Sequence, residues 1–340
     1  MTPEHPRQAL FEPEERVACA LPVCDHYSGV EPRMRKSLAL QAELGPVFDV
    51  TLDGEDGAPV GGEVEHAQLM AELVDSADNR WGRVGVRLPA LEHLRFDEVV
   101  DGLVQRAGAR LAYLALPKLR GLADLQRAAD KIDAACRRHG LARAIPLHGL
   151  VETHGALREV QALAAHPRVE SLSFGLMDFV SAHGGAIPAE AMSAAGQFEH
   201  PLVLRAKLEI AAACHGHAKT PSHGVVTEFN DLAALKAAAT QACRRLGYTR
   251  MWSIHPAQIR PIVEAFAPSA DELALAIELI GAAQAARWAP IRHRHDGQDR
   301  LHDRASYRYY WQLIERAERS AAAGGPALPA DLRAAWFGPA

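Results

Sequence analysis

The chain has 340 residues, of which 48% are hydrophobic and 23% charged, a composition that is ordinary for a globular protein and excludes wholesale disorder. Lys and Arg number 37 against 42 Asp and Glu, so the net charge of −5 does not favour general binding to nucleic acid. No run reaches the roughly 18 apolar residues that a membrane span needs, and the polar, acidic start does not resemble a signal peptide. With five scattered cysteines, these features predict a soluble, cytoplasmic protein with reduced thiols.

Short apolar runs alternate with longer helical segments along most of the chain. Eight runs have the length and composition of buried strands, and most begin about thirty residues after the one before, which is the length of a βα unit. These runs cover 17–23, 47–52, 83–88, 111–116, 144–151, 169–175, 224–227 and 250–254. Apolar residues at helical spacing predict helices at 121–139, 202–213 and 231–246, with Asp231 capping the last helix and Gly247 ending it.

This alternation predicts a parallel sheet with right-handed crossovers, closed into a (β/α)8 TIM barrel over residues 16–262. An open doubly wound sheet is the alternative, but no Gly-x-Gly-x-x-Gly follows the first strand, which disfavours its dinucleotide-binding form. Residues 263–323 are predicted to form a C-terminal helical extension with helices at 269–287 and 307–323, the first with a Ser269–Glu272 capping box. Residues 1–15 and 324–340 are predicted to be tails.

Polar side chains follow the predicted strands at the points where each strand ends. In a barrel, the carboxyl ends of all strands meet at one mouth, where active sites lie. Helix capping accounts for acidic residues at such positions. It does not account for Arg87 and Lys118, because a cation opposes the positive end of a helix dipole. The strand-end residues are Asp25, Asp53, Arg87, Lys118, Glu152, Asp178, Glu228 and His255.

Carboxylates are numerous at this predicted mouth, and they would repel one another unless a cation lies among them. A set of oxygen ligands favours Mg²⁺ over Zn²⁺, and Mg²⁺ takes only one or two protein carboxylates. Glu152 and Asp178 are the predicted ligands, because they follow neighbouring strands. The alternative is that each of these acids only caps its following helix. The carboxylates in question are Asp53, Glu55, Asp56, Glu152 and Asp178.

Three basic residues have two interpretations each. Arg87 is predicted to bind a substrate carboxylate or an enolate oxygen, with Glu55 and Asp56 orienting it or holding metal-bound water; the alternative is a structural salt bridge. Lys118 is expected to form ion pairs or attract a phosphate rather than form a Schiff base, because nearby acids keep it protonated. His255 is either an acid–base group or, as we favour, a turn histidine.

Six motifs in order, each at a predicted strand end, resemble those of the citrate lyase β-subunit family of CoA-ester lyases. The family has Asp-Leu-Glu-Asp after strand two, Arg on strand three, Leu-Pro-Lys, Ile-Glu-Thr, Phe-Gly-x-x-Asp and a His-Pro at the close of strand eight. The resembling segments are Leu52-Asp53-Gly54-Glu55-Asp56, Val86-Arg87, Leu116-Pro117-Lys118, Leu150-Val151-Glu152-Thr153, Phe174-Gly175 with Asp178, and Ile254-His255-Pro256 with Gln258-Ile259.

The resemblance implies a Mg²⁺ ion on Glu152 and Asp178, and a homotrimer or hexamer in which the C-terminal extension packs on a neighbouring subunit. It also implies that Asp303, with Asp299 behind it, acts as an acid or base in that neighbour's site. The implied catalytic residues are Arg87, Asp303, Glu55 and Asp56, and the implied substrate-binding residues are Arg87, Lys118, Gly175, Asp53 and His255.

The implied activity is carbon–carbon lysis, or the reverse, of a citryl-, malyl- or citramalyl-CoA-like thioester to an oxo acid and an acyl thioester. The alternatives are a Mg²⁺-dependent class II aldolase on free hydroxy-oxo acids and a citrate lyase β-like subunit that acts only with an acyl-carrier partner. Departures from the family pattern are expected to affect the rim, and hence the substrate more than the metal. They are Leu88-Pro89, Arg250-Met251, an enlarged first loop at 26–29 and the loop 181–201.

Overall fold

The structure is a computed structural model that describes residues 4–12, 21–58 and 60–338. The chain divides into two compact units. One is continuous, Leu21–Phe266, and the other combines Met1–Ala20 with Ala267–Ala340.

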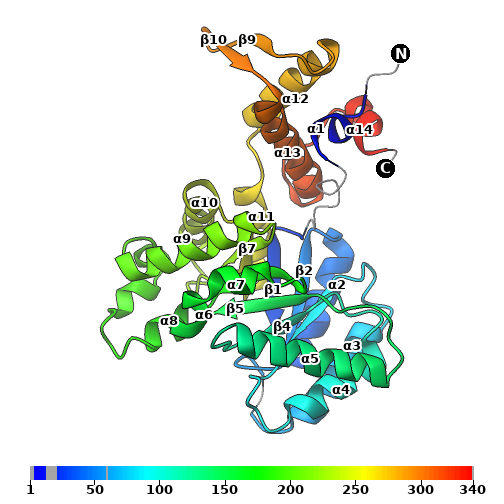
Figure 1. Ribbon diagram of the computed structural model, residues 1–340, viewed down its shortest axis with the longest axis vertical. Helices are drawn as coiled ribbons and strands as arrows, with labels where there is room; N and C mark the ends of the chain where they lie inside the picture. The colour runs from blue at the N-terminus through cyan, green and yellow to red at the C-terminus, as the bar shows by residue number, and fades with distance from the viewer. Residues whose placement is uncertain (1–3, 13–20, 59, 339–340) are drawn as a thin grey trace. The chain divides into compact units, whose positions relative to one another are not determined.

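The continuous unit is a closed barrel of eight parallel strands, each bonded to its neighbours in chain order and the last to the first (Figure 1). This arrangement confirms the predicted (β/α)8 fold. The strands are β1 (Cys24–Ser28), β2 (Phe48–Asp53), β3 (Val84–Arg87), β4 (Leu114–Leu116), β5 (Leu147–Val151), β6 (Val169–Phe174), β7 (Thr220–His223) and β8 (Arg250–Ser253).

Helices follow the strands and cover the outside of the barrel. Helix α10 begins after Asp231, whose side chain accepts from the Ala234 N–H, and ends at Gly247 in the left-handed conformation, as predicted. Among the described residues, no helix combines the length and the apolar character needed to cross a membrane. The helices are α2 (Glu31–Leu44), α3 (Glu63–Asp75), α4 (Phe96–Ala107), α5 (Leu122–Arg138), α6 (His154–Arg158), α7 (Val160–Ala165), α8 (Leu176–Ser181), α9 (Pro201–Gly216), α10 (Leu232–Leu246) and α11 (Ile259–Phe266), with 3₁₀ turns η2 (Ala189–Met192), η3 (Gly196–Phe198) and η4 (Pro256–Gln258).

Two predicted strands were misplaced. The run 17–23 falls largely outside the described residues, and β1 begins only at Cys24. Residues 26–28 therefore belong to a barrel strand, and the prediction of an enlarged first loop there was wrong. The run 224–227 follows β7, whose sequence Thr-Pro-Ser-His contains no aliphatic residue. Both errors have one cause: these strands carry polar side chains inward, so the search for apolar runs passed them over.

Near the amino ends of the strands, ion pairs rather than aliphatic packing hold the barrel interior together. The residues of this polar barrel floor are Asp25, Asp49, Tyr113, His148 and Arg250. The Arg250 guanidinium lies 3.0 Å from an Asp25 carboxylate oxygen and 2.6 Å from one of Asp49, and all three residues are buried. The Tyr113 ring stacks on His148 at 3.7 Å between centroids. Arg250, together with Arg83 on Asp49, thus offsets the two carboxylates of the barrel floor, and the prediction that Arg250 alters the substrate rim was wrong.

A smaller apolar layer separates this floor from the mouth. It consists of Tyr27, Ala115, Leu150 and Trp252. Each member lies two residues after a member of the polar floor, so it points to the same inward face of its strand. The layer supports whatever is placed at the carboxyl ends of the strands.

The second unit packs helices from both ends of the chain around one apolar cluster. The cluster joins Leu10 and Phe11 near the N-terminus with Trp311 and Trp336. Segments predicted to be tails thus contribute α1 and α14 to this unit. Ser269 and Glu272 form the predicted capping box, whereas the antiparallel hairpin of β9 and β10 was not predicted. The elements are α1 (Pro6–Leu10), α12 (Ala270–Ala285), β9 (Ile291–His295), β10 (Gln298–His302), α13 (Arg304–Ser320), η5 (Ala321–Ala323) and α14 (Ala330–Phe337).

Candidate active site

Arg87, the last residue of β3, is locked by acids of the neighbouring strand and loop. Its guanidinium binds Asp53 through two bonds, Nε to Oδ1 at 2.7 Å and Nη2 to Oδ2 at 2.6 Å, and Nη1 lies 3.1 Å from Glu55 Oε2. The N–H groups of Glu55 and Gly57 also donate to Asp53, both at 3.0 Å. Burial disfavours the charged guanidinium, but the hydrogen bonds that it donates to Asp53 outweigh this effect and raise the pKa of Arg87. The site therefore holds a fixed, permanent cation.

Lys118 links the Glu55 partner of this cation to Glu152, the acid that directly follows β5. Its Nζ lies 2.5 Å from Glu55 Oε1 and 3.1 Å from Asp56 Oδ1. Burial alone would lower the pKa of Lys118, but its hydrogen bonds to these carboxylates raise the pKa above its ordinary value. Its backbone adopts a left-handed φ of 51°, and its N–H donates to Glu152 Oε1 at 2.5 Å. An ammonium so paired is protonated, which supports an ion-pair role rather than Schiff-base chemistry.

Glu152 is a buried carboxylate in an unfavourable setting. It is 3% exposed, and burial raises its pKa to about 7 despite the hydrogen bond from Lys118, with the charges of Asp178 and Glu55 adding to the rise. Asp178 lies in the first turn of α8, directly after β6. A Cβ added at Gly175 would overlap Oε2 and Cβ of Glu152, so only glycine leaves room for this side chain.

The acids Glu152 and Asp178 fit a hard divalent cation. The charge of Asp178 adds to the rise in the pKa of Glu152, so positive charge near these carboxylates would be stabilising. Within the described ranges, no three His, Cys, Asp or Glu side chains form a ready-made metal cluster. Mg²⁺ does not require one, because it keeps several waters and takes one or two protein carboxylates. The donor set therefore suits Mg²⁺ better than a metal that demands a closed protein cage.

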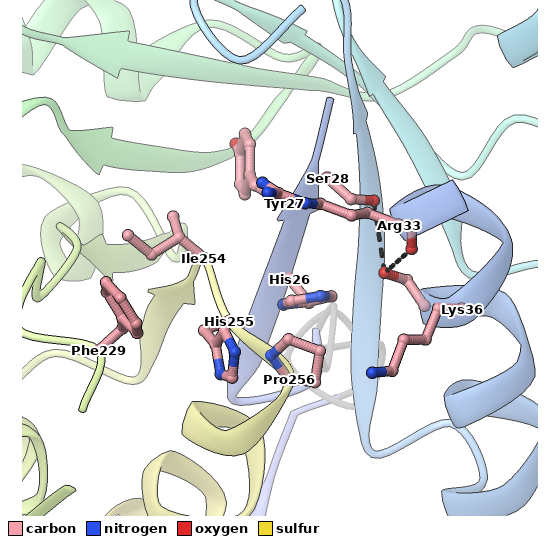
Figure 2. Close-up of a pocket in the computed structure, with 10 residues that line it drawn as sticks. His26, Tyr27, Ser28, Arg33, Lys36, Phe229, Ile254, His255 and Pro256 are labelled. Atoms are coloured by element: carbon pink, nitrogen blue, oxygen red, sulfur yellow. Dashed lines mark hydrogen bonds between the residues drawn. The ribbon is translucent and has the colours of Figure 1, made fainter. Parts of the chain in front are cut away.

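A cavity of ≈530 Å³ opens beside this cluster, at the carboxyl ends of β1 and β8. Arg33 and Lys36 of α2 line one side of it, and Phe229 and Ile254 lie on the opposite side (Figure 2). Tyr27 belongs to both regions: it lines the cavity, and its ring centre lies 5.4 Å from the Arg87 guanidinium carbon. The cavity and the acid cluster are therefore adjacent.

Two histidines also line the cavity. His255 accepts from the Ala257 N–H and forms a capping box with Gln258, as expected for a turn histidine, and its ring stacks on Phe229. His26 lies 3.0 Å from the Ser253 hydroxyl, and burial lowers its pKa to about 4. His26 is therefore neutral near pH 7, whereas His255 can still meet a ligand in the cavity.

The two C-terminal acids lie in the second unit. Asp303 is exposed and caps α13, accepting from the N–H groups of Ala305 and Ser306. Asp299 forms an ion pair with Arg292 across the β9–β10 hairpin. Their action in a neighbouring subunit's site stays a prediction.

The structure thus brings together most of the predicted site residues and adds others. Arg33 and Lys36 were not predicted, although both are exposed cations in the first two turns of α2, against the helix dipole. The argument that singled out Arg87 and Lys118 could have found them. The predicted residues gathered at the mouth are Asp53, Glu55, Asp56, Arg87, Lys118, Glu152, Gly175 and Asp178.

Comparisons with known proteins found relatives that cover most of the chain. No family model matches the chain. A crystal structure of a citrate lyase from Burkholderia xenovorans is 51% identical, with a TM-score of 0.83 over 98% of this chain and 99% of that one. The L-malyl-CoA/β-methylmalyl-CoA lyase of a Cereibacter sphaeroides strain is 27% identical over 307 residues, which cover 84% of this chain and 92% of that protein.

A more distant likeness concerns the fold alone. The protein CitE of Mycobacterium tuberculosis, solved in complex with magnesium, acetoacetate and coenzyme A, is 19% identical. It superposes with a TM-score of 0.67 over 88% of this chain and 98% of that one.

Proposed function

The chain belongs to the citrate lyase β-subunit and malyl-CoA lyase family, and from this premise we propose that it is a Mg²⁺-dependent carbon–carbon lyase acting on a β-hydroxyacyl thioester. The substrate is of the citryl-, malyl- or citramalyl-CoA type, and the products are an oxo acid and an acyl thioester. The observation that carries the proposal is the pair Glu152 and Asp178, opposed to a fixed Arg87 cation at the barrel mouth.

Glu152 and Asp178 would hold the Mg²⁺ ion, which when bound would supply Lewis-acid polarisation of the oxygen on the carbon that is cleaved. Gly175 leaves the space that the Glu152 carboxylate needs for this. Lys118 fixes one oxygen of that carboxylate through its N–H, so the other oxygen is presented from a defined direction.

In the lysis direction, the substrate hydroxyl passes its proton to a carboxylate base, for which the ionised Asp303 of a neighbouring subunit is the candidate, and becomes the carbonyl of the oxo acid. The carbon–carbon bond breaks, and its electron pair passes to the thioester α-carbon as an enolate. Arg87 stabilises this enolate oxygen, and its bonds to Asp53 and Glu55 hold it in place before the charge develops. A proton must then reach the α-carbon, and Asp303 of a neighbouring subunit is the candidate donor.

The cavity supports a thioester substrate over a free hydroxy-oxo acid. Its volume of ≈530 Å³ adjoins Arg87, which leaves room for a carrier arm beyond the reacting carbons. Arg33 and Lys36 at its rim would pair with phosphates such as those of CoA. A small free acid would leave this space and both cations unused.

The test is an assay of the purified chain with malyl-CoA, citramalyl-CoA and citryl-CoA, with Mg²⁺ or with a chelator, following oxo acid release. We expect lysis of at least one thioester that stops with the chelator. Glu152→Gln and Asp178→Asn should each lose roughly 100-fold or more of the turnover together with Mg²⁺ binding. Glu98→Gln, which changes an exposed acid, is the matched control.

Three results would overturn parts of the proposal. Lysis of free hydroxy-oxo acids but of no thioester would favour an aldolase. Activity only with a copurifying acyl carrier would favour a citrate lyase subunit. Wild-type turnover in both carboxylate variants would remove the metal assignment.

A further inference from the structure

Tyr27 occupies a fixed position between the cavity and the acid cluster. It lies on β1 and is 7% exposed. Its ring stacks on Trp252 with centroids 4.4 Å apart and planes 30° apart. Trp252 is itself held, because its Nε1–H donates to the Ser173 hydroxyl at 3.0 Å. Trp252 therefore packs against one face of the Tyr27 ring and limits its movement.

The same ring faces both places that a thioester substrate would have to occupy. Tyr27 lines the cavity, and the centre of its ring lies 5.4 Å from the Arg87 guanidinium carbon. A ligand that extends from Arg33 and Lys36 at the rim toward Arg87 must run along this ring. Burial raises the pKa of Tyr27, so the phenol stays protonated and adds no charge to the passage.

The Tyr27 ring is part of a packed apolar layer across the barrel interior. Tyr27 and Trp252 pack against Ala115 and Leu150 in one buried cluster, below which lies the polar barrel floor. An acyl group bound with its thioester carbonyl at Arg87 would point any further carbons at this cluster. Packed interiors do not open by a methylene without cost.

We propose that Tyr27 is a specificity-determining residue of the thioester site, whose ring closes the inner end of the cavity so that short acyl groups such as acetyl and propionyl are accepted and longer ones excluded. The inference rests on the proposed function, since it concerns the acyl thioester of that reaction. It identifies the residue that sets the substrate class.

The test compares acyl chain lengths in wild type, Tyr27→Leu and Tyr27→Phe. Acetyl-, propionyl-, butyryl- and hexanoyl-CoA are condensed with glyoxylate, and kcat/KM is measured for each. Tyr27→Leu should raise the hexanoyl-to-acetyl ratio roughly tenfold or more, because added methylenes change such ratios by about tenfold or more each. Tyr27→Phe, which keeps the ring, should keep the wild-type ratio. Leu208→Ala, which truncates an exposed side chain of α9 away from the cavity, should leave the ratio unchanged.

Direct binding of acetyl-CoA and hexanoyl-CoA, measured by calorimetry on the same variants, separates this inference from the proposed reaction. A shifted binding ratio in Tyr27→Leu without any turnover in wild type would retain the inference and reject the reaction. Turnover in wild type with an unchanged ratio in Tyr27→Leu would retain the reaction and reject the inference. If Tyr27→Phe shifted the hexanoyl-to-acetyl ratio as much as Tyr27→Leu, the inference would also be overturned, because the hydroxyl rather than the ring would then be responsible.

Discussion

Replacing Glu152 with Gln should stabilise the metal-free protein even though it removes a metal ligand. Burial raises the pKa of Glu152 from 4.5 to about 7, aided by Asp178 and Glu55. Since one pKa unit corresponds to 1.36 kcal/mol, a rise of about 2.5 costs the folded state about 3 kcal/mol when the carboxylate is ionised. A neutral Gln avoids this cost and can still accept the hydrogen bond from the Lys118 N–H.

The sign of the pH dependence follows from the direction of the shift. The folded protein binds the Glu152 proton more tightly than the unfolded chain, so its free energy of unfolding falls as pH rises from 4.5 to about 7, and this contribution is constant above that range. At pH 8, the free energy of unfolding of Glu152→Gln should therefore exceed that of wild type by about 3 kcal/mol. This difference should vanish below pH 4.5.

The assay is urea unfolding of chelator-treated protein from pH 4 to pH 8, with Glu98→Gln as the control for removing an exposed acid. Added Mg²⁺ should stabilise wild type, because it binds only the folded state, and should not stabilise Glu152→Gln. A variant that is less stable than wild type at pH 8, or a difference that does not change with pH, would refute the reasoning.

Two further substitutions test the geometry of the mouth and of the barrel floor. Gly175→Ala should weaken Mn²⁺ binding at least roughly tenfold, because the new methyl group overlaps Glu152 and must displace its carboxylate; electron paramagnetic resonance of free Mn²⁺ measures this. Arg250→Met should lower the free energy of unfolding by about 3–5 kcal/mol, because Asp25 would stay buried without its cation and Asp49 would keep only Arg83; urea unfolding measures this.

Matched controls accompany both substitutions. Gly102→Ala lies in α4, where an added Cβ meets nothing within 4 Å, so it should leave Mn²⁺ binding unchanged. Arg245→Met removes an exposed cation from α10 and should change stability by less than about 0.5 kcal/mol. Unaltered Mn²⁺ affinity in Gly175→Ala, or wild-type stability in Arg250→Met, would contradict the structural account.

The barrel was predictable because its βα repeat is periodic and most of its strands are apolar. Six of the predicted strand runs overlap observed strands, and the family resemblance of the strand-end motifs is confirmed by the comparisons. β1 and β7 were misplaced because their side chains are largely polar, and in β1 the ion pair of Asp25 with the distant Arg250 makes a polar strand interior stable. A local pattern of hydrophobicity cannot reveal such a partner.

The sequence predicted which residues form the site, but it did not predict the contacts between them. Strand ends identified Arg87, Lys118 and Glu152, whereas the two-bond contact of Arg87 with Asp53 depends on the register that places these residues opposite each other on β2 and β3. Helices α1 and α14 were missed for a similar reason: each is short and acquires its apolar partners only from segments far away in the chain.

Anomalous diffraction from a crystal soaked with Mn²⁺ tests the central claim most directly. The account predicts one strong peak at the barrel mouth, within bonding distance of carboxylate oxygens of both Glu152 and Asp178, that is absent in Glu152→Gln. A peak elsewhere, or the Lys118 ammonium lying between the two carboxylates in place of the ion, would contradict it.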